Sequence, residues 1–167
     1  MPLSMYQASV PVFVRVLNNL SAILDKGLAD AEARKIDPDV LVRARLAPDM
    51  HPLSRQVQIA TDQAKGGAAR LAGVEPPSFP DTESTFAELK ERIAKTVAFV
   101  QSIGADKIDG SEDRQITLKF PGGEFNFTGV DYLQNFVLPN IYFHATAAYA
   151  ILRHNGVPVG KRDFLGA

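Results

Sequence analysis

The chain has 167 residues, a length that suits a single domain with a substantial hydrophobic core. Its formal net charge is -1 and it has no basic run, so neither nucleic acid nor an anionic membrane is expected as a partner. It contains no cysteine, which excludes disulfides, thiolate metal sites and cysteine nucleophiles. The start MPLSMYQASV lacks a secretory pattern, and no stretch approaches the roughly 20 apolar residues of a membrane span, so a cytoplasmic location is expected.

The first half of the chain is predicted to hold two long helices. A capping-box pattern at Ser4, followed by apolar residues at helical spacing, predicts a helix over residues 4–28. Three prolines interrupt the connection that follows, which has room for a short helix near residues 38–43. A second helix is expected over residues 52–72, because proline is favoured at a first helical position and the glycine after residue 72 provides a stop. Its small residues, in KGGAARLAG, allow another helix to approach closely.

The second half combines helical and strand periods. After the proline-rich loop VEPPSFPDTES, a third helix is predicted over residues 85–103. Apolar and polar residues then alternate on both sides of PGG, which predicts a β-hairpin over about residues 114–127 that must pack on other elements to be stable. A fourth helix over residues 131–156 should be kinked by Pro139, and the segment GVPVGKRDFLGA should trail over the surface.

These elements predict a mainly all-α fold. Four long helices with one small hairpin before the last helix are most economically packed as an antiparallel four-helix bundle. We expect residues 1–167 to form one such domain.

The fourth helix carries the most interesting candidate residue, His144. It lies in the middle of a broad apolar stripe, and Asn140 precedes it by one helical turn on the same face. Two such side chains can share a metal, a water or a small ligand. The alternatives are that His144 is a hydrogen-bonded core residue and that Asn140 serves backbone groups disturbed by Pro139.

The order of elements and three segments carry a resemblance to a known family. PDMHPLSRQVQIATDQAKGGAARLAG, FTGVDYLQNFVLPNIYFHATAAYAILRHNGVPVGKRDFLG and the hairpin between them resemble an uncharacterised family of unknown function within the DinB/YfiT-like class of four-helix bundles. Members of that class are often described as metalloenzymes. The likeness covers nearly the whole chain and implies a DinB-like bundle that forms a homodimer.

The resemblance also implies a site for one divalent metal ion, such as zinc or nickel. In the class, one histidine on the second helix and two histidines four residues apart on the fourth helix hold the ion. The resemblance places His144 and Asn140 at the fourth-helix pair, so an amide stands where the first imidazole is expected. On the second helix the candidate ligands are His51, just before the helix, and Asp62, with Gln58 as a pocket residue at similar depth.

Two hypotheses for function are open at this point. The first is a small-ligand or metal pocket between the second and fourth helices around His144, lined also by Gln58 and Tyr149. If the pocket is catalytic, metal-assisted or histidine-assisted transfer or hydrolysis is the expected class, and the catalytic residues are not identified. The second is a non-enzymatic homodimeric bundle with a degenerate metal site and a scaffolding or stress-related role, for which Tyr142 and Phe143 offer an aromatic surface.

Overall fold

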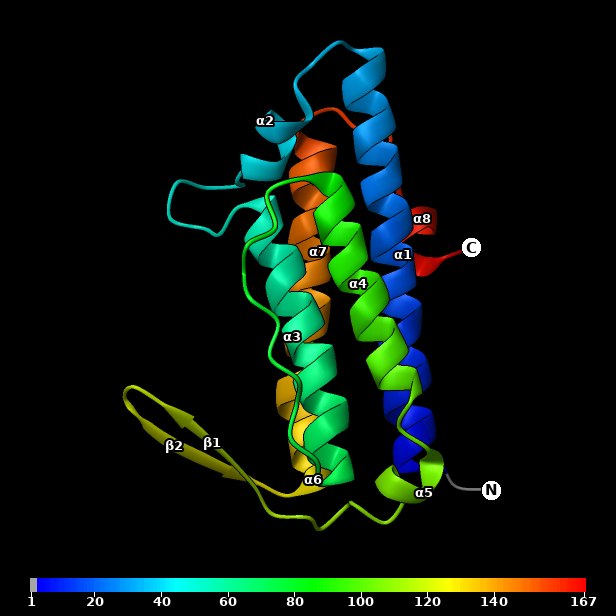
Figure 1. The fold of residues 1–167 in the computed structure, drawn as a ribbon, viewed down its shortest axis with the longest axis vertical. Coiled ribbons are helices and arrows are strands. Elements are labelled where there is room, and N and C mark those ends of the chain that lie inside the picture. The colour runs from blue at the N-terminus through cyan, green and yellow to red at the C-terminus, as the bar shows by residue number, and fades with distance from the viewer. Residues whose placement is uncertain (1–2) are drawn as a thin grey trace.

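The computed structural model describes residues 3–167 as a bundle of four long helices, with a hairpin that projects from one end (Figure 1). The long helices are α1 (Met5–Ala33), α3 (Leu53–Ala72), α4 (Phe86–Gln101) and α7 (Leu138–His154). The shorter elements are α2 (Pro38–Arg43), α5 (Ala105–Ile108), β1 (Ile116–Phe120), β2 (Gly123–Phe127), α6 (Gly129–Asp131), the π-helical segment η1 (Tyr132–Val137) and α8 (Lys161–Leu165). The predicted all-α bundle with an inserted hairpin is confirmed. No helix within residues 3–167 has the length and apolar character needed to cross a membrane.

Capping explains where α1 begins. The Ser4 hydroxyl accepts a hydrogen bond from the Gln7 backbone N–H, and the Gln7 side chain accepts one from the Ser4 N–H. The helix continues to Ala33, beyond the predicted end at residue 28. It does so because Ala31 is still buried against the core and Asp30 pairs with Arg34 one turn later, at 2.8 Å.

The disturbance predicted at Pro139 takes the form of a wider helical turn. Residues 132–137, directly before α7, are π-helical. Proline has no N–H to donate to the preceding turn, so the regular α-helical ladder is interrupted here. Asn140 compensates in part, because its side-chain amide donates to the backbone oxygen of Phe136 at 2.7 Å.

The prediction that the C-terminal segment trails over the surface was wrong for its first residues. Val157 and Val159 are buried, and the chain then forms α8. Asn19 of α1 donates a side-chain hydrogen bond to the backbone oxygen of Phe164 at 3.0 Å, which holds α8 against α1. The two valines alternate with proline and glycine, a short extended pattern that local periodicity does not mark as part of the core.

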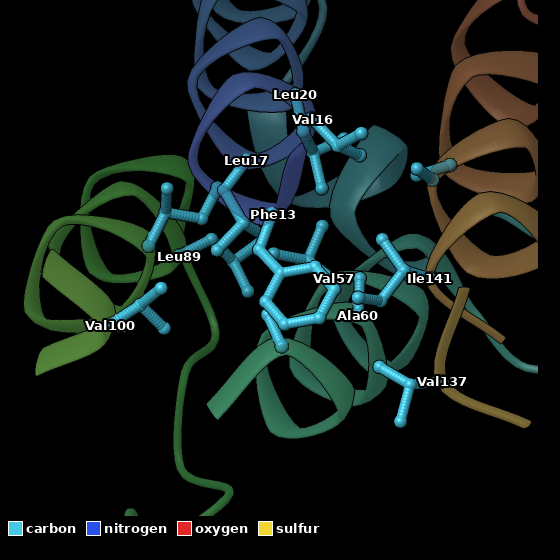
Figure 2. Packing of buried hydrophobic residues seen from close by; sticks show 14 of the residues in the cluster. Phe13, Val16, Leu17, Leu20, Val57, Ala60, Leu89, Val100, Val137 and Ile141 are labelled. Carbon is cyan, nitrogen blue, oxygen red and sulfur yellow. The ribbon is translucent and has the colours of Figure 1, made fainter. Parts of the chain in front are cut away.

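Close packing between α3 and its neighbours depends on Gly67. A Cβ atom at this position would lie 2.7 Å from Val137 Cγ1 and 3.4 Å from two ring atoms of Phe13. The small residue therefore lets α3 lie directly against η1 and α1, as KGGAARLAG predicted. Figure 2 shows the resulting core, with Phe13 between the helices.

The hairpin is antiparallel and is fixed to the bundle at its base. Ile116 pairs with Phe127 and Phe120 pairs with Gly123 at the turn. Ile116 and Leu118 are buried, and the ring of Phe127 lies 5.6 Å from the ring of Phe136 in η1. The tip extends away from the helices (Figure 1). The predicted packing of the hairpin on the bundle is thus confined to one end.

Candidate functional site around His144

A hydrogen-bond relay through the buried side chain of Gln56 orients the imidazole of His144. The histidine is partly buried on α7, and its Nδ1 lies 2.7 Å from Oε1 of Gln56 on α3. The Gln56 side chain is 1% exposed, and its Nε2 donates to the backbone oxygen of His51 at 3.1 Å. The relay therefore runs from His51, two residues before α3, through α3, to the middle of α7.

The relay assigns the tautomer of His144. Because the amide nitrogen of Gln56 donates to His51, the atom that faces His144 is the amide oxygen, which only accepts hydrogen bonds. Nδ1 must then carry the proton, and Nε2 is left with a free lone pair. Within residues 3–167, the side-chain hydrogen bond of His144 is the one through Nδ1. Nε2 is thus the atom available to a ligand.

Burial keeps this imidazole neutral. The pKa of His144 is lowered from its usual value to about 4, chiefly by desolvation and in smaller measure by the nearby charges of His51 and Arg55. At pH 7 a base with this pKa carries a proton in about one molecule in a thousand. The ring can accept a hydrogen bond or act as a neutral ligand, but it is a weak proton acceptor.

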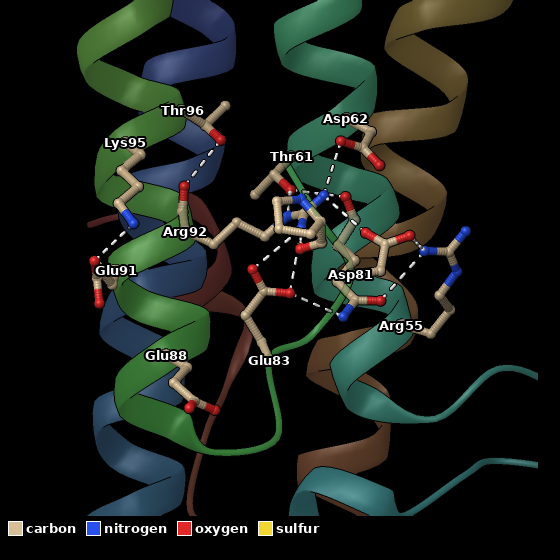
Figure 3. A network of polar contacts seen from close by, with 12 residues as sticks. Arg55, Thr61, Asp62, Asp81, Glu83, Glu88, Glu91, Arg92, Lys95 and Thr96 are labelled. Atoms are coloured by element: carbon tan, nitrogen blue, oxygen red, sulfur yellow. Dashed lines mark hydrogen bonds and ion pairs between the residues drawn. The ribbon is translucent and has the colours of Figure 1, made fainter. Parts of the chain in front are cut away.

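Two of the predicted site residues face another side of α3. Asp62 lies 2.9 Å from both Arg92 of α4 and Lys65 of α3. Gln58 donates from Nε2 to Glu83 at 3.0 Å. Six helical positions separate residue 62 from Gln56, which corresponds to about 120° around the helix axis. Gln58 therefore contacts the segment between α3 and α4, through Glu83, whereas Asp62 faces Arg92 of α4 (Figure 3).

The remaining predicted residues are placed as follows. Tyr149 packs edge-on against Phe164 of α8, with ring centroids 6.1 Å apart. Asn140 lies one turn before His144, but its amide group is bonded to the helix backbone. His51 has an exposed side chain and meets the relay through its backbone oxygen.

Gln56 is the residue that sequence reasoning missed. It stands three positions after Leu53 and four before Ala60, both of which are fully buried. A polar residue on the buried stripe of a helix requires a partner, because an unpaired amide is costly in the core. That position in the stripe was the signal that could have identified it.

The residues present do not fit the three-imidazole metal site that the resemblance implies. His144 is joined by an amide rather than by a second imidazole. Within residues 3–167, no three histidine, aspartate or glutamate side chains lie together as metal ligands would. Of the four candidate ligands, the structure associates only His144 and His51, the latter through its backbone.

A second polar cluster, centred on Arg92, was also not predicted. The Arg92 side chain is 1% exposed, and its Nε donates to the Thr61 hydroxyl at 2.8 Å. It pairs with Asp62, Asp81 and Glu83 at 2.9, 3.0 and 3.1 Å. Asp81 and Glu83 belong to the loop between α3 and α4, so the arginine fastens this loop over both helices (Figure 3). The hydrogen-bond donors of Arg92 are occupied by protein acceptors, so we interpret the cluster as structural: it holds the loop in place.

Comparisons with known proteins agree with this architecture. A family model described as a domain of unknown function, DUF1993, matches residues 5–165. Among solved structures, the chain is similar to the crystal structure of a DinB family member protein from Shewanella denitrificans, with 44% sequence identity and a TM-score of 0.89. That similarity covers 97% of this chain and 92% of the other. A search of curated proteins gave no match. The likeness in fold therefore extends over nearly the whole chain.

Proposed function

The chain belongs to the DUF1993 family, an uncharacterised DinB-like family of four-helix bundles, and from this premise we propose that it binds a small ligand beside His144, between α3 and α7. The observation that carries the proposal is the relay through Gln56, which leaves Nε2 of His144 with an unshared lone pair. A ligand with a hydroxyl or thiol group would donate a hydrogen bond to this atom.

The free-energy cost of burying the Gln56 amide supports a role for this residue beyond packing. A buried amide is tolerated only when its donor and acceptor are both satisfied, and an apolar residue at position 56 would fill the same space without that requirement. Gln56 instead meets one partner at each end of its amide. Such a second residue, which fixes the tautomer and the orientation of an imidazole, is a regular feature of histidines that bind ligands.

The low pKa favours binding over proton abstraction. A general base works best when its pKa lies near the working pH, and that of His144 is lowered to about 4. The same property suits a hydrogen-bond acceptor, because the lone pair stays free throughout the neutral range. His144 is therefore better suited to ligand recognition than to general-base catalysis.

Nuclear magnetic resonance of the imidazole nitrogens tests the relay directly. We expect Nδ1 of His144 to be protonated at pH 7 and the ring to stay neutral until the pH approaches about 4. In Gln56→Leu the preference for this tautomer should weaken, because the acceptor at Nδ1 is removed. A wild-type spectrum with the proton on Nε2, or a ring that titrates at the ordinary value, would contradict the proposal.

The free energy of unfolding should depend on pH through the protonation of His144. The unfolded chain takes up a proton at the ordinary histidine pKa, whereas the folded chain resists it until about pH 4. His144 therefore lowers the free energy of unfolding progressively as the pH falls through that interval, and it has no such effect above it. His144→Gln should reduce this part of the acid sensitivity.

Ligand binding is tested with small alcohols, small thiols and Zn²⁺ alone as probes. A saturable change in the His144 resonances, lost in His144→Ala and kept in His154→Ala, is the expected result for an alcohol or thiol. His154 is a suitable control because it lies on the same helix and is exposed. Stoichiometric zinc that disappears in His144→Ala would instead favour a metal site, and no response to any probe would overturn the proposal.

We also expect a homodimer, as the resemblance implies. Tyr142 and Phe143 are adjacent on α7 and are 42% and 58% exposed. Burying large aromatic rings of this kind is a common source of interface stability. Light scattering after size-exclusion chromatography should give twice the chain mass, and Tyr142→Ser with Phe143→Ser should shift it to the monomer. A monomeric wild-type protein at high concentration would refute this expectation.

A further inference from the structure

A groove separate from the His144 site runs between α3 and the hairpin strand β1. It consists of two cavities of about 330 and 240 Å³, and both are lined by Arg70 and Thr117. The larger cavity continues to Arg114, and the smaller one continues to the rings of Phe120 and Phe136. The groove therefore has a cation where the two cavities meet and an aromatic wall at one end.

Among the residues that the structure describes, no carboxylate neutralises the positive charge of Arg70. The guanidinium donates to the hydroxyl of Tyr132 at 3.0 Å. Burial raises the pKa of Tyr132 above its usual value, against a smaller opposing effect of Arg70, so this partner is a neutral phenol. The ion pairs formed within residues 3–167 do not include Arg70. Arg92, by contrast, pairs with three carboxylates.

Two glycines make room for the arginines of the groove. A Cβ atom on Gly66, in the interior of α3, would collide with Nη1 of Arg70. One on Gly73, at the end of the same helix, would collide with the guanidinium of Arg114. Glycine in a helix interior lowers helix stability relative to alanine, so Gly66 needs a reason to be there. The reason we find is that Arg70 lies flat against the helix at this point.

The aromatic wall comes from the π-helical segment and the hairpin. Tyr132 and Phe136 of η1 stack with their ring centroids 5.8 Å apart, and Phe120 of β1 lies 6.4 Å from Phe136. Phe120 remains 44% exposed. π-helical turns occur frequently at functional sites. This one contributes both the phenol that holds Arg70 and the ring beside it.

The other charged groups of the groove leave a place for an anion at its centre. Arg114 and Lys119 add positive charge. Asp62 also lines the smaller cavity, but it is already paired with Arg92 and Lys65. Glu75, in the larger cavity, is the remaining acidic group.

We propose that this groove binds a small organic carboxylate, whose carboxylate group pairs with Arg70 and whose apolar body lies against Phe120 and Phe136. The planar guanidinium matches a carboxylate in two parallel hydrogen bonds, and an apolar body gains from burial on the aromatic wall. The site shares no residue with the relay at His144. The proposal for the groove can therefore be tested independently of the proposed ligand at His144.

Benzoate and inorganic phosphate are the probes for the test, with backbone amide resonances as the readout. Benzoate should cause saturable shifts at Thr117 and Gly66 with one site per chain. Arg70→Gln should weaken benzoate binding by about tenfold or more, the effect of losing a charge-assisted pair. Arg153→Gln, on an exposed part of α7, should leave it unchanged.

Gly66→Ala provides a variant that keeps every charge. Alanine favours the helix, and the three atoms nearest to the added methyl group all belong to the movable end of Arg70, so the protein should fold while the guanidinium is displaced. We expect severalfold weaker benzoate binding in Gly66→Ala, and none of this effect in Gly160→Ala, where no atom lies within 4 Å of the added group. Equal binding by wild type, Arg70→Gln and Gly66→Ala would overturn the proposal. So would a response to phosphate but not to benzoate.

Discussion

Replacing Arg92 with alanine should lower the free energy of unfolding by about 3 kcal/mol, because it leaves the acceptors of a buried cation without their partner. The side chain is 1% exposed and pairs with Asp62, Asp81 and Glu83. Removing one member of a buried ionic cluster typically costs about 3–5 kcal/mol. We expect the lower end here, since Asp62 and Asp81 keep partial contact with water at 35% and 40% exposure.

Lys95→Ala is the matched control for this variant. Lys95 lies on the same helix, is 60% exposed and pairs with Glu91 at 2.7 Å. Exposed pairs of this kind contribute at most about 1 kcal/mol. Urea unfolding measures both variants, and limited proteolysis should cut the loop of residues 74–85 faster in Arg92→Ala alone. Equal stability of the two variants would show that the buried cluster does not fasten the loop.

Phe13→Ala should cost about 3–5 kcal/mol, the range for removing a fully buried aromatic ring. Phe13 is 0% exposed and lies in the centre of the bundle among residues of α1, α3 and α7 (Figure 2). The cavity cannot close easily, because Gly67 beneath the ring has no side chain to fill it. The loss should be seen as a lower midpoint in urea, with little change in the denaturant slope.

A phenylalanine on the surface provides the comparison. Phe125 lies near the hairpin tip and is 59% exposed, so Phe125→Ala should change the free energy of unfolding by less than about 0.5 kcal/mol. If Phe13→Ala were as mild as Phe125→Ala, the packing between α1 and α3 would have to differ from that described.

Features with a local cause were predicted well. Ser4 and Gln7 cap the first helix, and Gly73 ends α3 in the left-handed conformation that favours glycine. The alternation on both sides of PGG placed the hairpin, whose strands span 116–120 and 123–127. In these cases a few neighbouring residues determine the backbone, so the sequence contains the necessary signal.

Features that depend on distant partners were not predicted. Arg92 and Asp62 are 30 positions apart, and each taken alone is typical of a solvated helix face. Lys65 fitted the same interpretation, yet it is 6% exposed and lies over the ring of Phe79. Gln56 and His144 are 88 positions apart, so their pairing follows from the packing of α3 on α7. Local patterns cannot identify such pairs without the tertiary fold.

The π-helical segment gives the last long helix two rotational phases. A π turn accommodates one residue more than an α turn, so side chains before and after it are offset by about 100° relative to an uninterrupted α-helix. Tyr132 and Phe136 lie within the π-helical segment, and His144 lies in the α-helix that follows it. One continuous stretch of chain thereby presents residues both to the groove under the hairpin and to the relay on α3. The extra residue thus uncouples the two orientations, so that each can be adjusted by packing around its own half of the helix.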